Sequence, residues 1–459
     1  LPNDIARLSV ELPVVKDCRD EDYVVMEVNK AMLELRRNGG GPVHINLITT
    51  YSRDFSVKEL PHVKVMRRFQ AWDELPVLPE GRIGIYVGSH THFSEKQNRA
   101  IDRFCATYDA VVICDHTSGY YGKYKLLPTL VQLQSDITSP FPPLDLMVHI
   151  GEISAASFND TIPAKEVWRV SEDGELRDPF KKLTTVFQMS EEMFFLHYGK
   201  DGCNRHVLID ECRELFGEIY EQIPELPFCN IWTAMQLSSR LPKGALFHMG
   251  VSNTRRCWNM FQLPESVESA CNVGCCGIDG CVSTLVGASL VNPDRLCYVV
   301  VGDLTFFYDL NSLGNHHIGT NLRVMLVNNG RGTEFRLGIH HCNVFGDDAD
   351  KYMAAAGHFG NKSPLLVKHY AEDLGFHYLS ATTKEEFMTA LSNFTNPQLS
   401  DHSMILEVFT DSKDESEALY LMSHIQSDAK GMVRSKLKDA VRNVAGEKGI
   451  NAIKKILKK

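Results

Sequence analysis

The chain has 459 residues, 44% of them hydrophobic and 23% charged, which is the composition of an ordinary folded protein and excludes intrinsic disorder and fibrous repeats. Its formal net charge of −10 argues against nucleic acid as the main partner, and no apolar run approaches the ~20 residues of a membrane-spanning helix. The 13 cysteines lack CxxC metal spacing, so we expect reduced thiols in a cytoplasmic protein.

At the N-terminus the pattern predicts a helix followed by a strand. Apolar residues recur at helical spacing over residues 21–37, a glycine-rich loop at 38–42 ends that helix, and residues 43–47 have the composition of a strand. The polar, proline-containing stretch 49–81 has the character of an interdomain linker. Because the chain begins with Leu-Pro-Asn rather than Met, we expect it to start partway into a longer protein.

Two further units alternate apolar strands with helical patterns. The first contains a helix at 97–108, and the second runs from about residue 227 to residue 421. The expected strands are 83–88, 110–115 and 144–151 in the first unit, and 244–250, 296–302, 322–327 and 403–408 in the second. Strands that alternate with helices are typical of parallel sheets covered by helices on both faces. The predicted fold class is therefore α/β, with parallel-sheet three-layer domains.

The C-terminal tail, residues 430–459, differs from the rest in charge. It holds ten Lys and Arg against two acidic residues, a net charge of +8, so the remaining residues carry −18. Its apolar residues recur at helical spacing, which predicts a basic amphipathic helix or a pair of helices. Two partners fit this tail: the surface of an anionic membrane, which would make the protein peripheral there, or the acidic surface of the chain itself.

Polar side chains follow two neighbouring strands of the second unit. Asp303 comes directly after one Val-rich strand, and Asn328-Asn329-Gly330 comes directly after the next. The carboxyl ends of adjacent parallel strands lie side by side, at the edge where ligands bind. Carboxylate and amide oxygens are hard ligands that suit Mg²⁺ bound to a diphosphate. The sequence therefore predicts a magnesium and diphosphate site at this edge.

These residues resemble the thiamine diphosphate (ThDP) motif of the pyruvate-decarboxylase-like superfamily. The longer run GDLTFFYDLNSL, at 302–313, is similar to one branch, the 2-succinyl-5-enolpyruvyl-6-hydroxy-3-cyclohexene-1-carboxylate synthases of the menaquinone pathway, usually called MenD. The run NVGCCGIDGCVST, at 272–284, resembles that family's NRGxxGIDGxxST. Further similarity lies in residues 41–46, 167–170 and 177–179, so the resemblance covers nearly the whole chain outside the tail.

The resemblance implies a division of the chain into four segments. They are a C-terminal remnant of a pyrimidine-binding domain with the start of a linker, a central α/β domain, a diphosphate-binding (ThDP/Mg) domain and the basic tail. We place them at residues 1–55, 56–226, 227–429 and 430–459. Enzymes of this family build active sites between two subunits, so the resemblance also implies a homo-oligomer, either a dimer or a tetramer.

The cofactors implied by the resemblance are ThDP and Mg²⁺. Asp303, Asn329 and the backbone carbonyl of Arg331 would be the metal ligands. Ile278 would hold ThDP in its bent conformation, and the turn at 277–280 would offer backbone N–H groups to the diphosphate. The implied cofactor-binding residues are Gly277, Ile278, Gly302, Asp303, Leu304, Asn329, Arg331 and Thr333.

Three residues are candidates for substrate binding. Ser252 and Arg256 match a family Ser and Arg that hold acidic substrates, and Phe335 follows the cofactor loop. A 2-oxo acid is an anion, and Arg grips a carboxylate bidentately. The alternative for Arg256 is an ordinary surface arginine.

The sequence departs from the family at positions that affect the substrate. The Arg of the family motif is Val273 here, and the family's central Lys-Arg pair falls near Ser157 and Phe158. The loss of these cations argues for an acceptor other than the family's own. Glu334 stands where an apolar residue is usual, so it is either an acid/base group of a different reaction or a carboxylate at the rim.

The predicted activity is that of a ThDP-dependent lyase or transferase, a 2-oxo acid decarboxylase and carboligase. The family's catalytic Glu lies in the pyrimidine-binding domain, and only 40 residues precede Gly41, so we identify no such Glu. The chain is then a fragment of a longer protein, or a separate subunit supplies the missing domain. The other alternative is a non-catalytic subunit that binds the cofactor and is tethered through its basic tail.

Overall fold

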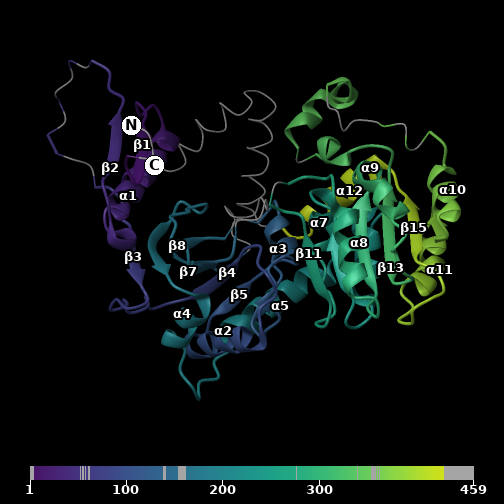
Figure 1. The fold of residues 1–459 in the computed structure, drawn as a ribbon, viewed down its shortest axis with the longest axis horizontal. Coiled ribbons are helices and arrows are strands. Elements are labelled where there is room, and N and C mark those ends of the chain that lie inside the picture. Colours follow the sequence, from purple (N-terminus) through teal and green to yellow (C-terminus); the bar gives the residue numbers. More distant parts are fainter. Residues whose placement is uncertain are drawn as a thin grey trace.

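The structure of the chain is a computed structural model that describes residues 5–51, 53, 56, 58–59, 62–137, 141–152, 162–274, 276–338, 340–352, 358, 360 and 362–427. The tail at 430–459 and the positions Ser157 and Phe158 lie outside these described residues. Figure 1 shows a small N-terminal unit, a seven-stranded sheet and a six-stranded sheet following one another across the molecule. All strand pairs within these sheets are parallel, which confirms the α/β class. The four domain boundaries stay predictions.

The N-terminal unit consists of two parallel strands and one helix. Strand β1 (Leu8–Leu12) pairs with β2 (Val43–Leu47), and α1 (Cys18–Glu34) connects them. Asp17 caps α1, because its carboxylate accepts hydrogen bonds from two backbone N–H groups of the first turn. The predicted helix and strand are confirmed, although α1 ends three residues early, before the short 3-10 helix η1 (Arg37–Gly39).

The seven-stranded sheet has the order β3-β9-β8-β7-β4-β5-β6. Its strands are β3 (Arg67–Gln70), β4 (Ile83–Val87), β5 (Val111–Ile113), β6 (Lys125–Leu126), β7 (Leu144–Ile150), β8 (Ala164–Val170) and β9 (Leu183–Gln188). Its helices are α2 (Glu95–Tyr108), α3 (Thr129–Leu133), α4 (Glu191–Tyr198) and α5 (Val207–Glu221). The interpretation of 49–81 as a linker is wrong in part, since β3 lies within that stretch and pairs with β9. Only four residues long, it is too short to show an alternating pattern.

Helix α2 shows why the local sequence specifies its element. Ser94 and Gln97 form a capping box, in which each side chain bonds the other's backbone N–H. The helix buries residues such as Ile101 and Phe104 and packs with α4, and both helices lie along the same side of the sheet in Figure 1. Burial of these apolar side chains, at ~25 cal/mol per Å², is the main force that holds the helix there.

The six-stranded sheet has the order β11-β10-β12-β13-β15-β14. Its strands are β10 (Leu246–Met249), β11 (Glu268–Cys271), β12 (Cys297–Gly302), β13 (Leu322–Asn328), β14 (His377–Ala381) and β15 (Met404–Phe409). The associated helices are α6 (Asn230–Leu237), η3 (Ser238–Arg240), α7 (Asn253–Trp258), α8 (Cys281–Val291), α9 (Asp303–Asp309), η4 (Leu310–Gly314), η5 (Thr333–Arg336), η6 (His341–Lys351), α10 (Leu366–Asp373), α11 (Lys384–Phe394) and α12 (Ser412–Ser423).

Strand β12 is buried on both faces. Val299 and Val301 pack in one hydrophobic cluster with residues of α8, α9 and α10, whereas Tyr298 and Val300 pack in another with residues of α6, α11 and α12. This is the three-layer arrangement, and it explains why the central strands are continuous apolar runs. The second cluster continues into the seven-stranded sheet, and Gln134, just beyond α3, donates a 2.8 Å hydrogen bond to the Met422 carbonyl in α12.

Two general features of the described residues bear on the sequence predictions. The cysteines among them are free thiols, so no disulfide occurs in this part of the chain. Within the described residues no helix is both long and apolar enough to cross a bilayer.

Buried histidines predict a loss of stability in acid. Burial lowers the pKa of His149 to about 3 and the pKa of His248 to about 4. Unfolding exposes these imidazoles, which then take up protons below pH ~6.5, so the free energy of unfolding falls as the pH falls from 6.5 toward 4. We expect His149→Gln to lose less stability than the wild type between pH 7 and pH 5 in urea denaturation. Equal losses in the two proteins would contradict this.

Candidate functional site

The candidate site lies at the carboxyl edge of the six-stranded sheet. The strand order reverses between β10 and β12, which is the place where ligands bind in open parallel sheets. Ser252 follows β10, Asp303 follows β12 and Asn329 follows β13. The fold therefore gathers three of the candidate residues at one edge, as expected from the strand pattern.

Asp303 is the first residue of α9 and is only 2% exposed. One carboxylate oxygen, Oδ1, accepts a hydrogen bond from the backbone N–H of the next residue, Leu304. The other, Oδ2, accepts a hydrogen bond from the backbone N–H of Gly330 at 2.5 Å. The Nε2 atom of His358 lies 3.2 Å from Oδ2. These contacts fix the carboxylate beside the loop that follows β13.

The two asparagines after β13 have different environments. The Nδ2 group of Asn328 donates a 2.7 Å hydrogen bond to Glu407 on β15. The side-chain oxygen of Asn329 is buried and has no hydrogen-bond partner among the described residues. A buried oxygen without a donor is costly unless something else binds it. Asn329, one residue before the Gly330 that binds Asp303, therefore offers the kind of oxygen that a hard cation takes.

The turn before α8 leaves room for a ligand at the start of a helix. Gly280 is the N-cap of α8 with a φ of 101°, so the N-cap residue has no side chain with which to cap the helix. Gly302 has open space where a Cβ would be. Ile278 is half-buried against the hydrophobic cluster that contains α8. One N–H of the first turn, that of Ser283, is already bound by the Asp309 carboxylate at 2.7 Å, which leaves the N–H groups of Cys281 and Val282 as the donors that an anion such as a diphosphate could take.

Arg256 and Glu334 form a bidentate ion pair. The Nη1–Oε2 and Nη2–Oε1 distances are 3.0 and 2.7 Å, and both side chains are largely buried. Burial lowers the pKa of Arg256, the hydrogen bonds and charge of Glu334 raise it, and the net shift is upward. Glu334 is thus bound to a cation in this structure. The predicted roles of Arg256 toward substrate and of Glu334 in proton transfer stay predictions.

Removal of Glu334 should be strongly destabilising, because Arg256 would keep its charge in a buried site without its partner. We expect Glu334→Ala to lose about 3 kcal/mol of stability, measured by urea denaturation at pH 7. A double variant with Arg256→Met should recover much of that loss, since it removes the unpaired charge. If the double variant is no more stable than Glu334→Ala, the unpaired charge of Arg256 is not the cause of the lost stability.

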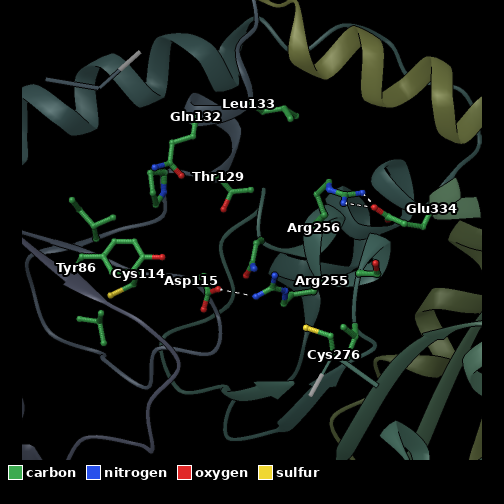
Figure 2. Close-up of a pocket in the computed structure, with 16 residues that line it drawn as sticks. Tyr86, Cys114, Asp115, Thr129, Gln132, Leu133, Arg255, Arg256, Cys276 and Glu334 are labelled. Carbon is green, nitrogen blue, oxygen red and sulfur yellow. Dashed lines mark hydrogen bonds and ion pairs between the residues drawn. The ribbon is translucent and has the colours of Figure 1, made fainter. Parts of the chain in front are cut away.

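A cavity of about 240 Å³ lies between the two large sheets, and we call it the inter-sheet pocket. Its polar lining, drawn in Figure 2, comes from the units of both sheets: Tyr86, Cys114, Asp115, Thr129 and Gln132 from the first, and Ser252, Arg255, Arg256, Asn259, Cys276 and Glu334 from the second. The Arg256–Glu334 pair forms one wall, and Arg255 extends toward Asp115. The candidate substrate residues Ser252 and Arg256 therefore share a cavity.

The remaining candidates lie on the loop that follows Asn329. Thr333 is buried, and its hydroxyl oxygen has no hydrogen-bond partner among the described residues. The ring of Phe335 packs edge-on against the His340 ring at 5.1 Å between centroids. Arg331 lies at the start of this loop. The loop thus buries Thr333 and holds the Phe335 ring against His340.

Sequence reasoning missed several polar residues around this site. Glu407 is 1% exposed; burial raises its pKa, the hydrogen bonds from Asn328 and Tyr378 oppose that shift, and the charge of Asp303 adds to it. Asp115 and Arg255 belong to units far apart in sequence, so no spacing rule connects them. One sequence feature could have pointed to Glu407: it is a carboxylate inside an otherwise apolar strand.

The chain is similar to a set of curated bacterial proteins, although no family model matches it. The 2-succinyl-5-enolpyruvyl-6-hydroxy-3-cyclohexene-1-carboxylate synthase of Bacteroides thetaiotaomicron is 28% identical over 443 residues, which are 90% of this chain and 76% of that protein. The synthase of the same name from Bacteroides fragilis is 29% identical over 448 residues, with the same coverage. That of Phocaeicola vulgatus is 28% identical over 449 residues, covering 90% of this chain and 75% of the relative.

These matches run through both sheets rather than one motif, since they extend over nine-tenths of the chain. The parallel α/β architecture and the polar carboxyl edge described above lie within that extent. Over most of its length, this chain is a distant homologue of 2-succinyl-5-enolpyruvyl-6-hydroxy-3-cyclohexene-1-carboxylate synthases.

Proposed function

We propose that the chain binds Mg²⁺ and ThDP at the carboxyl edge of the six-stranded sheet and serves the decarboxylation of a 2-oxo acid and the ligation of the product to an acceptor. The observation that carries this proposal is the buried Asn329 oxygen, which has no hydrogen-bond partner among the described residues and lies on the loop whose Gly330 N–H binds the Asp303 carboxylate. The distant homology to synthases that join carbon skeletons supports the same class of reaction.

In this proposal each part of the edge has its own role. Asp303, Asn329 and the carbonyl of Arg331 hold the metal, and the glycine turn at the start of α8 takes the diphosphate. Ile278 supports the ring system from the apolar side. Bound ThDP supplies the nucleophilic carbon and the electron sink that decarboxylation requires.

The acceptor in this proposal differs from that of the homologues. Val273 is buried and uncharged where the family motif has Arg. Arg256 is paired with Glu334, so the guanidinium already has a carboxylate partner. A pocket with fewer free cations favours a less acidic acceptor than one built for several carboxylates.

A second candidate function is a non-catalytic, cofactor-binding subunit. The observation that favours it is that Glu334, the acid/base candidate, is held in an ion pair with Arg256. In either case we propose a homo-oligomer, and a basic tail that attaches the protein to anionic membrane surfaces. Sedimentation with anionic vesicles tests the tail: equal pelleting with and without residues 430–459 would contradict the attachment.

The two candidates differ in turnover. We would measure CO₂ release from a panel of 2-oxo acids with the whole chain, ThDP and Mg²⁺, and with a blank that lacks ThDP. Release that depends on ThDP supports the enzyme. Binding of ThDP without release from any member of the panel supports the non-catalytic subunit, and absence of both contradicts the proposal.

A further inference from the structure

We propose that Arg255 is an anion-binding residue that holds the carboxylate of a small organic acid in the inter-sheet pocket. Neither the homologous motif nor the pairing described above assigns it a role. Arg255 lies in α7, next to Arg256, and its side chain is 8% exposed. That the acid is a substrate rests on the proposed function, whereas the anion binding does not.

The hydrogen bonding of Arg255 is incomplete. Its Nε and Nη1 groups are buried and have no acceptor among the described residues. The nearest carboxylate oxygen, Oδ2 of Asp115, is 3.5 Å from Nη1, too far for a well-formed hydrogen bond. A buried guanidinium with unsatisfied N–H groups is costly, so a site that retains one gains from an acceptor that completes it.

Asp115 is held away from a bidentate pairing with Arg255. Its Oδ1 atom accepts hydrogen bonds from both the backbone N–H and the hydroxyl of Thr117, each at 2.6 Å. The turn that follows β5 therefore fixes the carboxylate, and only one oxygen faces the arginine. Asp115 orients the guanidinium and leaves its remaining N–H groups for another acceptor.

The two neighbouring arginines differ in what they can bind. Arg256 already makes two short hydrogen bonds to Glu334, which satisfies the fork of its guanidinium. Arg255 makes no short hydrogen bond to a carboxylate among the described residues, although its side chain is at least as well buried as that of Arg256. Of the two, Arg255 is the one whose donors remain for a ligand in the pocket. Figure 2 shows the two side chains extending to separate acidic residues.

The backbone around the pocket is strained at two positions. Ser252 has a φ of 70° and a ψ of −120°, and Cys276 has a φ of 53°. Both residues line the same cavity as Arg255. Strain of this kind destabilises the folded chain and is concentrated at ligand sites. This is an observation independent of the arginine, and it points to the same cavity.

The lining indicates the chemistry of the ligand. Thr129 and Gln132 add neutral hydrogen-bonding groups, while Tyr86 and the aliphatic residues of the wall add apolar area. Arg255 is suited to a planar carboxylate, and the cavity of about 240 Å³ limits the acid to a small one. In the proposed reaction this is the carboxylate of the acceptor or of the 2-oxo acid.

The test is calorimetric titration of the whole chain, without ThDP, with acetate, succinate and glutarate as probes. We expect at least one probe to bind, and Arg255→Gln to weaken that binding by about 10- to 100-fold. Asp115→Asn keeps the acceptor for Thr117 and removes the opposing charge, so it should tighten binding. Arg295→Gln is the matched control: Arg295 pairs with Glu268 at the opposite edge of the sheet.

Three results would overturn the proposal: no binding of any probe to the wild type, equal binding by Arg255→Gln, or weaker binding by Asp115→Asn. The opposite signs expected for the two variants separate a ligand role from a structural one. If Arg255→Gln does not fold, the sign of the Asp115→Asn effect still decides. The chain could also bind a probe, with weaker binding in Arg255→Gln and tighter binding in Asp115→Asn, and yet fail to bind ThDP. That result would support the anion site and contradict the proposed function.

Discussion

Replacing Asn329 with alanine should reduce the affinity for ThDP in the presence of Mg²⁺ by at least about 100-fold, because even the outer partners of metal ligands contribute 10- to 100-fold. The fold should not suffer, since the Asn329 side-chain oxygen has no hydrogen-bond partner among the described residues. We expect a change in the free energy of unfolding within about 1 kcal/mol. Titration calorimetry and urea denaturation measure the two effects.

Asn328→Ala is the matched control, one residue earlier in the chain. Asn328 is 4% exposed and donates to Glu407, so its loss leaves a buried carboxylate with fewer donors. We expect a destabilisation of about 2 kcal/mol, with cofactor binding affected much less than in Asn329→Ala. The reverse pattern, with binding lost only in Asn328→Ala, would place the metal ligand on the other asparagine.

Replacing Glu415 with glutamine should stabilise the protein at alkaline pH by about 3 kcal/mol. Glu415 lies in α12 and is 1% exposed. One oxygen accepts hydrogen bonds from the backbone of Asn230 and the hydroxyl of Thr410, and the other has no partner among the described residues. Burial raises the pKa of this carboxyl to about 7, and the two hydrogen bonds only partly oppose the shift.

The raised pKa of Glu415 sets the sign of the effect. Between pH 4.5 and 7 the folded state keeps a proton that the unfolded state releases, so the free energy of unfolding falls as the pH rises through that window. Glutamine keeps the accepting oxygen and cannot ionise. The wild type and the variant should therefore be close in stability near pH 5 and diverge toward pH 8. Glu417→Gln, an exposed change in the same helix, is the control.

The difference between the two proteins isolates Glu415 from other titrating groups. The buried histidines act with the opposite sign, because they destabilise the fold as the pH falls. They are common to wild type and variant, so they cancel in the difference. Parallel stability curves for wild type and Glu415→Gln from pH 5 to pH 8 would contradict the raised pKa.

Much of the fold could be predicted because the central strands are buried on both faces. Strands such as β7, β12 and β13 are continuous apolar runs, and their predicted and observed bounds agree within one residue at each end. β3, β6, β11 and β14, which lie at the edges of their sheets, were not predicted, and neither were β1, β8 and β9. Their pairing is decided by tertiary contacts rather than by local pattern.

The site could be predicted in part for a related reason. The position of Asp303 and Asn329 follows from the rule that parallel strands end at one edge, which needs only the strands themselves. The pairing of Arg256 with Glu334 could not be predicted, because 78 residues separate them and any exposed anion would satisfy the same arginine. Long-range charge pairs depend on how loops pack, and the spacing of residues in the sequence does not indicate how loops pack.

The central claim is that the carboxyl edge of the six-stranded sheet binds ThDP through Mg²⁺. The most direct test is calorimetric titration of the whole chain with ThDP, with and without Mg²⁺, alongside Asp303→Ala and the exposed control Asp294→Ala. The account predicts binding that requires Mg²⁺, persists in Asp294→Ala and is lost in Asp303→Ala. No binding by the wild type, or equal binding by Asp303→Ala, would contradict it.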